Sequence, residues 1–164
     1  MKKLFYKDIS SPVGKLRLVA TDKALVQLLF WSETSHAKLN GTNISPTLIQ
    51  SHPVLNQAEK QLKEYFLGKR KKFDLELATE GTDFQKKVWS ALQRIPYGKT
   101  KSYGDIARTI GQPKASRAVG GANNKNPIAI IVPCHRVIGA NGDLTGFGGG
   151  LSVKEKLLAL EACR

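Results

Sequence analysis

The sequence predicts two small domains: an α/β domain over residues 1–78 and a mainly α domain over residues 79–164 that holds a winged-helix-like helix-turn-helix. Two observations indicate this fold class. Short β-rich apolar runs follow one another at the start of the chain, and after Thr79 the apolar residues recur at the spacing of helices. A chain of 164 residues has room to bury a core either in one ordinary domain or in two small domains packed closely together.

Three strands and a helix are expected at the start of the first domain. The runs LFYKDIS, GKLRLVA and ALVQLLFW are separated by Ser-Pro-Val-Gly and Thr-Asp-Lys, which are typical of turns. A polar loop over 32–52 leads to apolar residues at helical spacing from Pro53, and this helix is expected to stop near Gly68. A charged turn at 69–72 and a strand over 73–77, FDLEL, follow.

Two helices are expected at the start of the second domain. The apolar residues within 84–95 lie at helical spacing and follow two capping candidates, Thr82 and Asp83. Ser102 and Asp105 have the spacing of a capping box and open the second helix, which ends at a glycine.

A third helix, over residues 115–125, completes a helix-turn-helix. Its inward positions are Ala115, Ala118, Val119 and Ala122. Its outer face carries small and polar residues around Arg117, and its two glycines each cost about 1 kcal/mol relative to alanine. Close approach of another backbone accounts for such glycines, either a neighbouring helix or a DNA strand. Arg117 on this face favours DNA.

The segment IVPCHRVI contains the most reactive candidate side chain. The continuous apolar run 128–132 fits a buried strand, so Cys134 is expected where a rigid element ends. Cys134 is either an inert core cysteine or a nucleophile for which the neighbouring His135 is the base. Adjacent residues of an extended chain point to opposite faces, so His135 can reach the thiol only if Pro133 turns the chain or a water bridges the two, and the bridging water is favoured.

A carboxylate completes a candidate triad from the last helix. Ser152 and Glu155 have capping-box spacing, and Glu161 falls on the apolar stripe that follows them. Glu161 is then either a buried acid that orients His135 or an exposed acid at the helix end. The stripe consists of Val153, Leu157, Leu158 and Leu160. The glycine-rich stretch 139–150 before this helix is either a connector or a pocket wall.

Charge indicates the class of partner. The chain has 26 Lys and Arg against 13 Asp and Glu, a formal net charge of +13. Residues 86–136 contain ten basic side chains and one acid, Asp105. A polyanion is therefore the expected partner, and the alternative is a solvated basic surface.

Neither a membrane span nor a signal peptide is indicated, which suggests a cytoplasmic protein with free thiols at Cys134 and Cys163. No Cys-x-x-Cys or His-x-x-x-His spacing occurs, so no metal is expected.

Three segments together resemble one known family. PCHRV at 133–137, RAVGGA at 117–122 and Asn126-Pro127 resemble the O6-alkylguanine-DNA alkyltransferases of bacterial type. The resemblance covers essentially all of 80–164, while residues 1–79 are more loosely similar to the short, ribonuclease H-like N-terminal domain of bacterial members.

This resemblance implies direct reversal of DNA damage without a cofactor. Cys134 would take the alkyl group from O6 of guanine, and from O4 of thymine, in flipped-out duplex DNA and keep it permanently, so that each molecule acts once. The family pattern makes His135 the activator of Cys134 through a water and Glu161 the residue that orients His135. Asn126 would support the turn that shapes the site.

The resemblance also implies a monomer whose third helix lies in the minor groove of duplex DNA. Arg117 would take the place of the flipped base. Tyr103 would contact that base, and the backbone carbonyls of Cys134 and Val137 would receive the guanine amino group. The further DNA contacts implied are Lys101, Ser102, Lys114, Ala118, Gly121 and Asn124.

Two departures from the family pattern change the expectations. Phe147 and Gly148 stand where some relatives have a tyrosine and a serine or alanine, so this wall of the base pocket loses a hydroxyl contact and is expected to accept larger alkyl groups. The first 79 residues contain no cysteine, so the structural zinc of some relatives is not expected.

Two other function classes fit parts of the sequence. A non-catalytic protein that recognises alkylated bases, or a helix-turn-helix regulator, would explain the basic helices, but the alkyltransferase-like proteins replace the reactive cysteine that is present here. A cysteine hydrolase could use Cys134, His135 and Glu161, but its base is normally distant in sequence, and a net charge of +13 argues against a peptidase.

Overall fold

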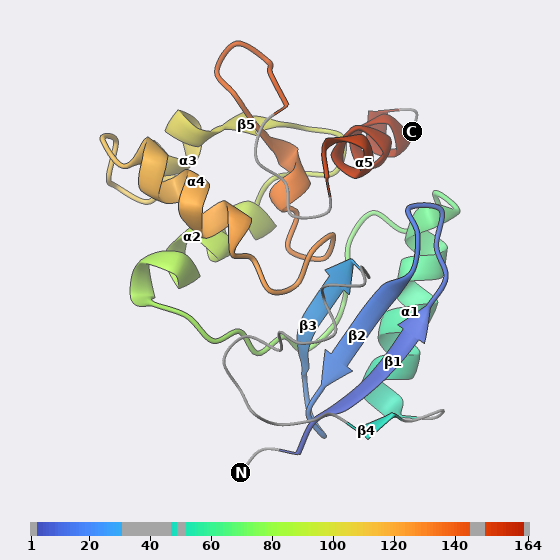
Figure 1. Cartoon of the computed structure of the whole chain (residues 1–164). Helices are drawn as coiled ribbons and strands as arrows, with labels where there is room; N and C mark the ends of the chain where they lie inside the picture. Colours follow the sequence, from blue (N-terminus) through green and yellow to red (C-terminus); the bar gives the residue numbers. More distant parts are fainter. Residues whose placement is uncertain (1–2, 31–46, 49–51, 145–149, 163–164) are drawn as a thin grey trace. The chain divides into compact units, whose positions relative to one another are not determined.

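The computed structural model describes residues 3–30, 47–48, 52–144 and 150–162, and the chain divides into two compact units, Met1–Thr79 and Glu80–Arg164 (Figure 1). None of the helices in these described ranges is long and apolar enough to cross a membrane.

The first unit is a small sheet with one helix against it. Its elements are β1 (Phe5–Ile9), β2 (Leu16–Ala20), β3 (Leu25–Phe30), β4 (Thr47–Leu48) and α1 (Pro53–Phe66). The sheet order is β3-β2-β1-β4, in which β1 to β3 are antiparallel and β4 runs parallel to β1. Helix α1 contacts β1, β2 and β3 (Figure 1). The predicted three strands and helix are confirmed.

Helix α1 begins and ends where the sequence indicates. His52 is its N-cap, because Nδ1 accepts a hydrogen bond from the Leu55 N–H at 3.5 Å, and Pro53 fits the first turn. Gly68 follows the helix with φ 74°, a conformation that favours glycine. The helix buries Leu55, Ala58, Leu62 and Tyr65 against the sheet core formed by Leu16, Leu18, Leu25 and Leu28.

The prediction of a strand over 73–77 is wrong, because the segment forms only one isolated β-bridge, between Leu77 and Leu25. The backbone of Asp74 pairs instead with the side chain of Gln61, whose amide donates to the Asp74 carbonyl and accepts from the Asp74 N–H, each at 2.9 Å. A buried side chain therefore takes the hydrogen bonds that a neighbouring strand would supply.

The second unit is mainly helical. Its elements are α2 (Asp83–Gln93), β5 (Lys101–Ser102), α3 (Tyr103–Thr109), α4 (Ser116–Asn124), a 3₁₀ turn (Cys134–Arg136), β6 (Val137–Ile138) and α5 (Leu151–Ala162). Strands β5 and β6 pair in parallel. Helices α2, α3 and α4 pack on one another, and α3 and α4 form the predicted helix-turn-helix (Figure 1).

The capping signals predicted for the first two helices of this unit are confirmed, and of the two candidates for α2 it is Thr82 that caps the helix. Thr82 caps α2 in a capping box with Gln85, and Ser102 caps α3 in one with Asp105. Gly111 follows α3 with φ 79°. These local signals position the tight turn that precedes α4.

The prediction of a buried strand over 128–132 is also wrong. The segment is buried, but it folds as consecutive turns. Asn126 organises these turns: its amide donates to the Val132 carbonyl at 2.7 Å, and its Oδ1 accepts from the Ile128 N–H at 3.0 Å. Ile130 has φ 70°, which is rare for a β-branched residue and incompatible with a strand.

Two helices differ in detail from the expectation. In α4 the buried residues are Val119, Ala122 and Asn123, and the prediction that Ala118 points inward is wrong, because Ala118 is exposed. Helix α5 begins at Leu151, so Ser152 lies inside it and is not the N-cap.

Candidate active site and nucleic-acid interface

The Pro-Cys-His-Arg segment places three consecutive side chains in the interior. Cys134, His135 and Arg136 form the 3₁₀ turn and are 5%, 0% and 5% exposed. In an extended strand successive side chains would alternate between two faces. The turn removes this constraint, and for this reason all three can be buried.

A buried carboxylate connects the two basic residues of this turn. Glu161 Oε2 lies 2.7 Å from His135 Nε2, and the Arg136 guanidinium donates to both Glu161 oxygens at 2.8 and 3.0 Å. Arg136 also donates to the Ile95 carbonyl at 2.7 Å. Of the two placements left open for Glu161, the buried one is confirmed, since Glu161 is 2% exposed. Two partners compensate its burial.

The other ring nitrogen of the histidine remains available. Within the described part of the chain, His135 Nδ1 is buried without a hydrogen-bond partner. Because Nε2 is held by Glu161, Nδ1 is the atom left for proton transfer. Burial lowers the pKa of His135 more than the hydrogen bond and charge of Glu161 raise it, and the charges of Arg136 and Lys154 lower it further. The imidazole is therefore neutral at neutral pH.

The thiol is protected from solvent and from ionisation. Burial raises the pKa of Cys134. A hydrogen bond from the Asn126 side chain, the charge of Lys154 and the backbone N–H groups of the turn lower it in part. A thiol of this kind is a nucleophile only when its proton is taken up, which a neutral imidazole next in sequence can do.

Sequence reasoning missed three buried polar residues of the site. Arg136 was counted among the basic residues of segment 86–136. Lys154 is fully buried on α5 and donates to the Val137 carbonyl at 2.5 Å. Asn123, at the end of α4, donates to the Cys134 carbonyl at 3.4 Å. Lys154 could have been found, because it shares a helix face with Leu157 and Glu161 at spacings of three and seven residues.

The outer face of α4 is open and small. Its exposed residues are Arg117, Ala118, Gly121 and Asn124. A Cβ atom added at Gly121 would meet nothing within 4 Å, so this glycine is not required by packing inside the protein. At Gly120 an added Cβ would lie 3.8 Å from the ring of Tyr103 on α3, which is ordinary contact.

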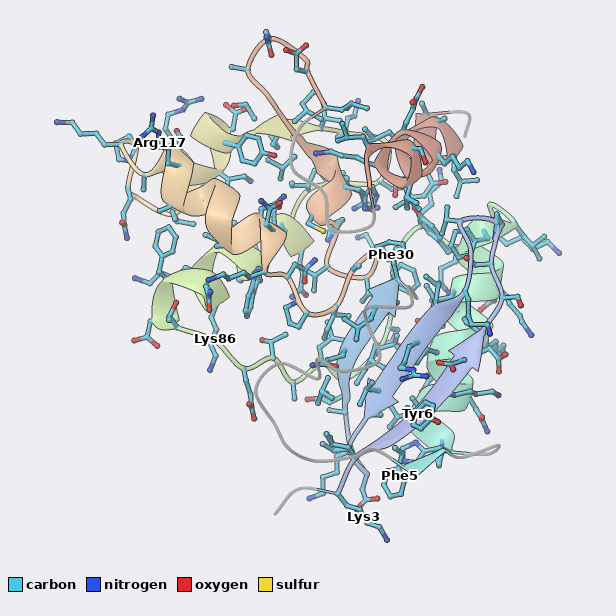
Figure 2. The ribbon with its side chains drawn as sticks, viewed as in Figure 1. Lys3, Phe5, Tyr6, Phe30, Lys86 and Arg117 are labelled. Atoms are coloured by element: carbon cyan, nitrogen blue, oxygen red, sulfur yellow. The ribbon has the colours of Figure 1, made fainter. Side chains whose placement is uncertain are left out.

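Basic side chains surround the helix-turn-helix but are not confined to α4. Lys101 and Lys114 are exposed near its two turns, and Ser102 uses its hydroxyl to accept from the Asp105 N–H. Figure 2 shows Arg117 on α4 and Lys86 on α2 extending in different directions from the helical unit. The positive charge therefore covers more than one face of the unit.

Some predicted residues fall outside the described ranges. Phe147, Gly148 and Cys163 belong to segments 145–149 and 163–164. Within the described ranges, no group of three or more His, Cys, Asp or Glu side chains is placed to hold a metal ion.

Comparisons with known proteins match both units. The family model described as "6-O-methylguanine DNA methyltransferase, DNA binding domain" matches residues 83–163. The model described as "6-O-methylguanine DNA methyltransferase, ribonuclease-like domain" matches residues 4–79. The two matches support the fold class expected from the sequence, a small antiparallel sheet domain followed by a helical DNA-binding domain.

Whole-chain relatives agree with these matches. The methylated-DNA--protein-cysteine methyltransferase of Methanosarcina acetivorans is 49% identical over 158 residues, which is 96% of this chain and 98% of the relative. The constitutive enzyme of the same name from Bacillus subtilis is 46% identical, over 96% of this chain and 94% of the relative. Among solved structures, Mycobacterium tuberculosis OGT in complex with DNA has 49% identity and a TM-score of 0.87 over 97% of this chain and 93% of that chain.

Proposed function

The chain belongs to the 6-O-methylguanine DNA methyltransferase family, and we propose that it repairs duplex DNA by taking the alkyl group from O6 of guanine onto Cys134. The sulfur–carbon bond forms as the bond between the alkyl carbon and O6 breaks, and the thiol proton ends on the guanine ring. The products are S-alkylcysteine and intact guanine, so each molecule acts once. O4-alkylthymine is a second substrate of the same chemistry.

The observation that carries this proposal is the buried contact between His135 and Glu161 beside a buried Cys134 thiol. Neutral His135 accepts the thiol proton at Nδ1 through a bridging water, and Glu161 holds the ring by Nε2 and stabilises the cation that forms. Asn126 donates to Cys134 and fixes the turn before it. No metal or cofactor takes part in these steps.

Duplex DNA that contains the alkylated base is the partner. Helix α4 enters the minor groove with its small exposed face, and Arg117 fills the space of the flipped nucleotide. Tyr103 contacts the flipped base, and the carbonyls of Cys134 and Val137 accept its amino group. The remaining contacts come from Lys101, Ser102, Lys114, Ala118, Gly121 and Asn124. Phe147 and Gly148, which the family resemblance places at the base pocket, lie outside the described residues.

The protein works as a monomer in the cytoplasm, where a free thiol stays reduced. A DNA-binding and alkyltransferase domain over 79–164 performs the reaction, and the α/β domain over 1–78 precedes it. The two compact units of the structure, which meet between Thr79 and Glu80, support this division.

Incubation with a duplex that carries one O6-methylguanine tests the proposal. Intact mass and peptide mapping are expected to find one methyl group on Cys134 and the lesion restored to guanine. An unmodified protein that still binds the duplex would indicate a binding protein instead. Cleavage of a peptide or ester substrate would indicate a hydrolase.

The transfer rate is expected to fall only at acidic pH. Neutral His135 is the form that accepts the thiol proton, and burial lowers the pKa of His135 below its usual value near 6.5. Burial raises the pKa of Cys134, so the thiol keeps its proton at neutral pH until His135 accepts it. Single-turnover rates at saturating duplex should therefore be nearly constant between about pH 6.5 and 8.5 and decrease only below that range. A rate that rises about tenfold per pH unit across pH 6.5–8.5 would show that the thiolate forms without His135.

Arg117→Ala is expected to slow transfer from duplex DNA by about tenfold or more, because an unfilled gap in the base stack costs on the order of a few kcal/mol. Transfer from the free base O6-benzylguanine, which needs no flipping, should stay within a factor of two of the parent rate. Equal losses on both substrates would place the effect of Arg117 in the active site and contradict its role in flipping.

A further inference from the structure

Helix α2 carries a basic stripe on its exposed side. Lys86, Ser90 and Arg94 follow one another at spacings of four residues, so they lie along one side of the helix, with Lys87 beside them. These four side chains and Ile110 line an open hollow of about 310 Å³. The lining contains no acidic residue, and its two lysines and one arginine are all exposed.

The three cations of this α2 stripe are not used inside the protein. Across the described ranges, no ion pair is found for Lys86, Lys87 or Arg94. Elsewhere Lys7, Arg17 and Arg70 are paired with carboxylates. Three like charges around one hollow repel each other, and an anion bound between them would relieve this repulsion.

The α2 stripe and the outer face of α4 both lie on the sides of their helices that face away from the α2–α4 contact. Helix α2 buries Val88, Trp89, Ala91 and Leu92, on the side opposite the stripe. The indole N–H of Trp89 donates to the Ala122 carbonyl of α4 at 2.9 Å, and Ala122 lies on the buried face of α4. The two helices therefore pack by their inner sides. Figure 2 shows Lys86 and Arg117 extending in different directions.

A straight duplex lying on the outer face of α4 therefore does not also cover the α2 stripe. From Lys86 to Arg94 the helix rises about 12 Å, which matches the axial length of roughly three to four base pairs. Lys86, Lys87 and Arg94 can each contact a phosphate of a DNA backbone segment of this length. A duplex backbone is thus a better match than a single small anion.

We propose that the α2 stripe is a second DNA-binding surface, which holds the phosphate backbone of a second duplex while α4 occupies the first. This rests on the proposed function for the role of α4. One molecule then bridges two DNA segments, and it can pass from one to the other without dissociating into solution. Movement of this kind between DNA segments suits a protein that acts once and must find rare lesions among many undamaged sites.

Complexes with an excess of a short undamaged duplex test this at low salt, with mass measured by light scattering. The wild-type protein is expected to form a complex of one protein and two duplexes. The triple variant Lys86→Gln, Lys87→Gln, Arg94→Gln should stop at one duplex, with second-duplex affinity reduced at least tenfold. The matched control removes three exposed lysines of the first unit, Lys23→Gln, Lys60→Gln and Lys69→Gln, and should keep both duplexes.

Methyl transfer by the same variants separates this inference from the proposed function. The α2 triple variant should methylate Cys134 from a lesion duplex at the wild-type rate under saturating conditions. Absence of transfer in the wild-type protein would refute the proposed function and not the second surface. A wild-type complex of two proteins and two duplexes, a wild-type limit of one duplex, or a triple variant that keeps both would each overturn the second surface.

Discussion

Cys134→Ala is expected to abolish alkyl transfer completely while the variant still binds duplex DNA that carries O6-methylguanine. No neighbouring group can replace the sulfur: His135 and Glu161 hold each other, and Lys154 donates to a carbonyl. Alanine removes one atom from a buried position that is 5% exposed, so the fold should lose only about 1 kcal/mol. Intact mass after incubation checks the first expectation, and a gel-shift titration the second.

Cys163→Ala is the matched control, because it removes the other cysteine of the sequence. It should keep single-turnover transfer at the parent rate. Methylation of the Cys134→Ala variant at any residue would refute the assignment of the nucleophile. Loss of duplex binding in that variant, with the fold intact by circular dichroism, would show that Cys134 contributes to recognition as well as to chemistry.

Elements with local signals could be predicted from the sequence. Thr82 with Gln85 and Ser102 with Asp105 each form a reciprocal pair of hydrogen bonds within four residues. Such caps depend only on residues three apart in the sequence. The helix-turn-helix could therefore be predicted from local residues. Helical spacing put Glu161 on the apolar stripe of its helix but left open whether this acid is buried or exposed at the helix end.

Backbone conformations set by hydrogen bonds from a single amide side chain could not be predicted from the pattern of apolar residues. The apolar run 128–132 indicates burial, but its conformation is set by the Asn126 side chain, which bonds to both ends of the run. Apolar runs of this length do not distinguish a strand from compact turns. Likewise, the Gln61 side chain makes the hydrogen bonds to the Asp74 backbone that a neighbouring strand would otherwise make. In both segments an amide side chain outweighs the β propensity of the sequence.

The burial of the two basic residues of the site could not be predicted from their residue type. Arg136 and Lys154 are basic residues of a strongly basic chain, and such residues are mostly exposed. Arg136 is buried because Glu161, 25 residues away, supplies a bidentate partner. Composition therefore indicates the charge of the surface but not that two of the cations stabilise the interior.

Glu161→Gln is expected to cost both stability and rate. The substitution leaves the Arg136 guanidinium buried without its counter-charge, and breaking such a pair by removing one partner costs about 3–5 kcal/mol. His135 also loses the carboxylate that stabilises its protonated form, so transfer should slow by about 100-fold. Urea unfolding at neutral pH measures the first effect, and single-turnover transfer in buffer without urea measures the second. Glu155→Gln, an exposed acid on the same helix, should change stability by less than about 0.5 kcal/mol.

A double variant separates the two roles of Glu161. Glu161→Gln combined with Arg136→Met removes both charges of the pair, so part of the lost stability should return, since replacing a buried ion pair by apolar groups is often close to neutral. The transfer rate should not return, because His135 still lacks its carboxylate. If rate and stability recover together, Glu161 acts only by holding the fold. If the single variant is as stable as the parent, the bidentate contact with Arg136 carries no net stabilisation, and burial of the Cys-His-Arg turn depends on packing alone.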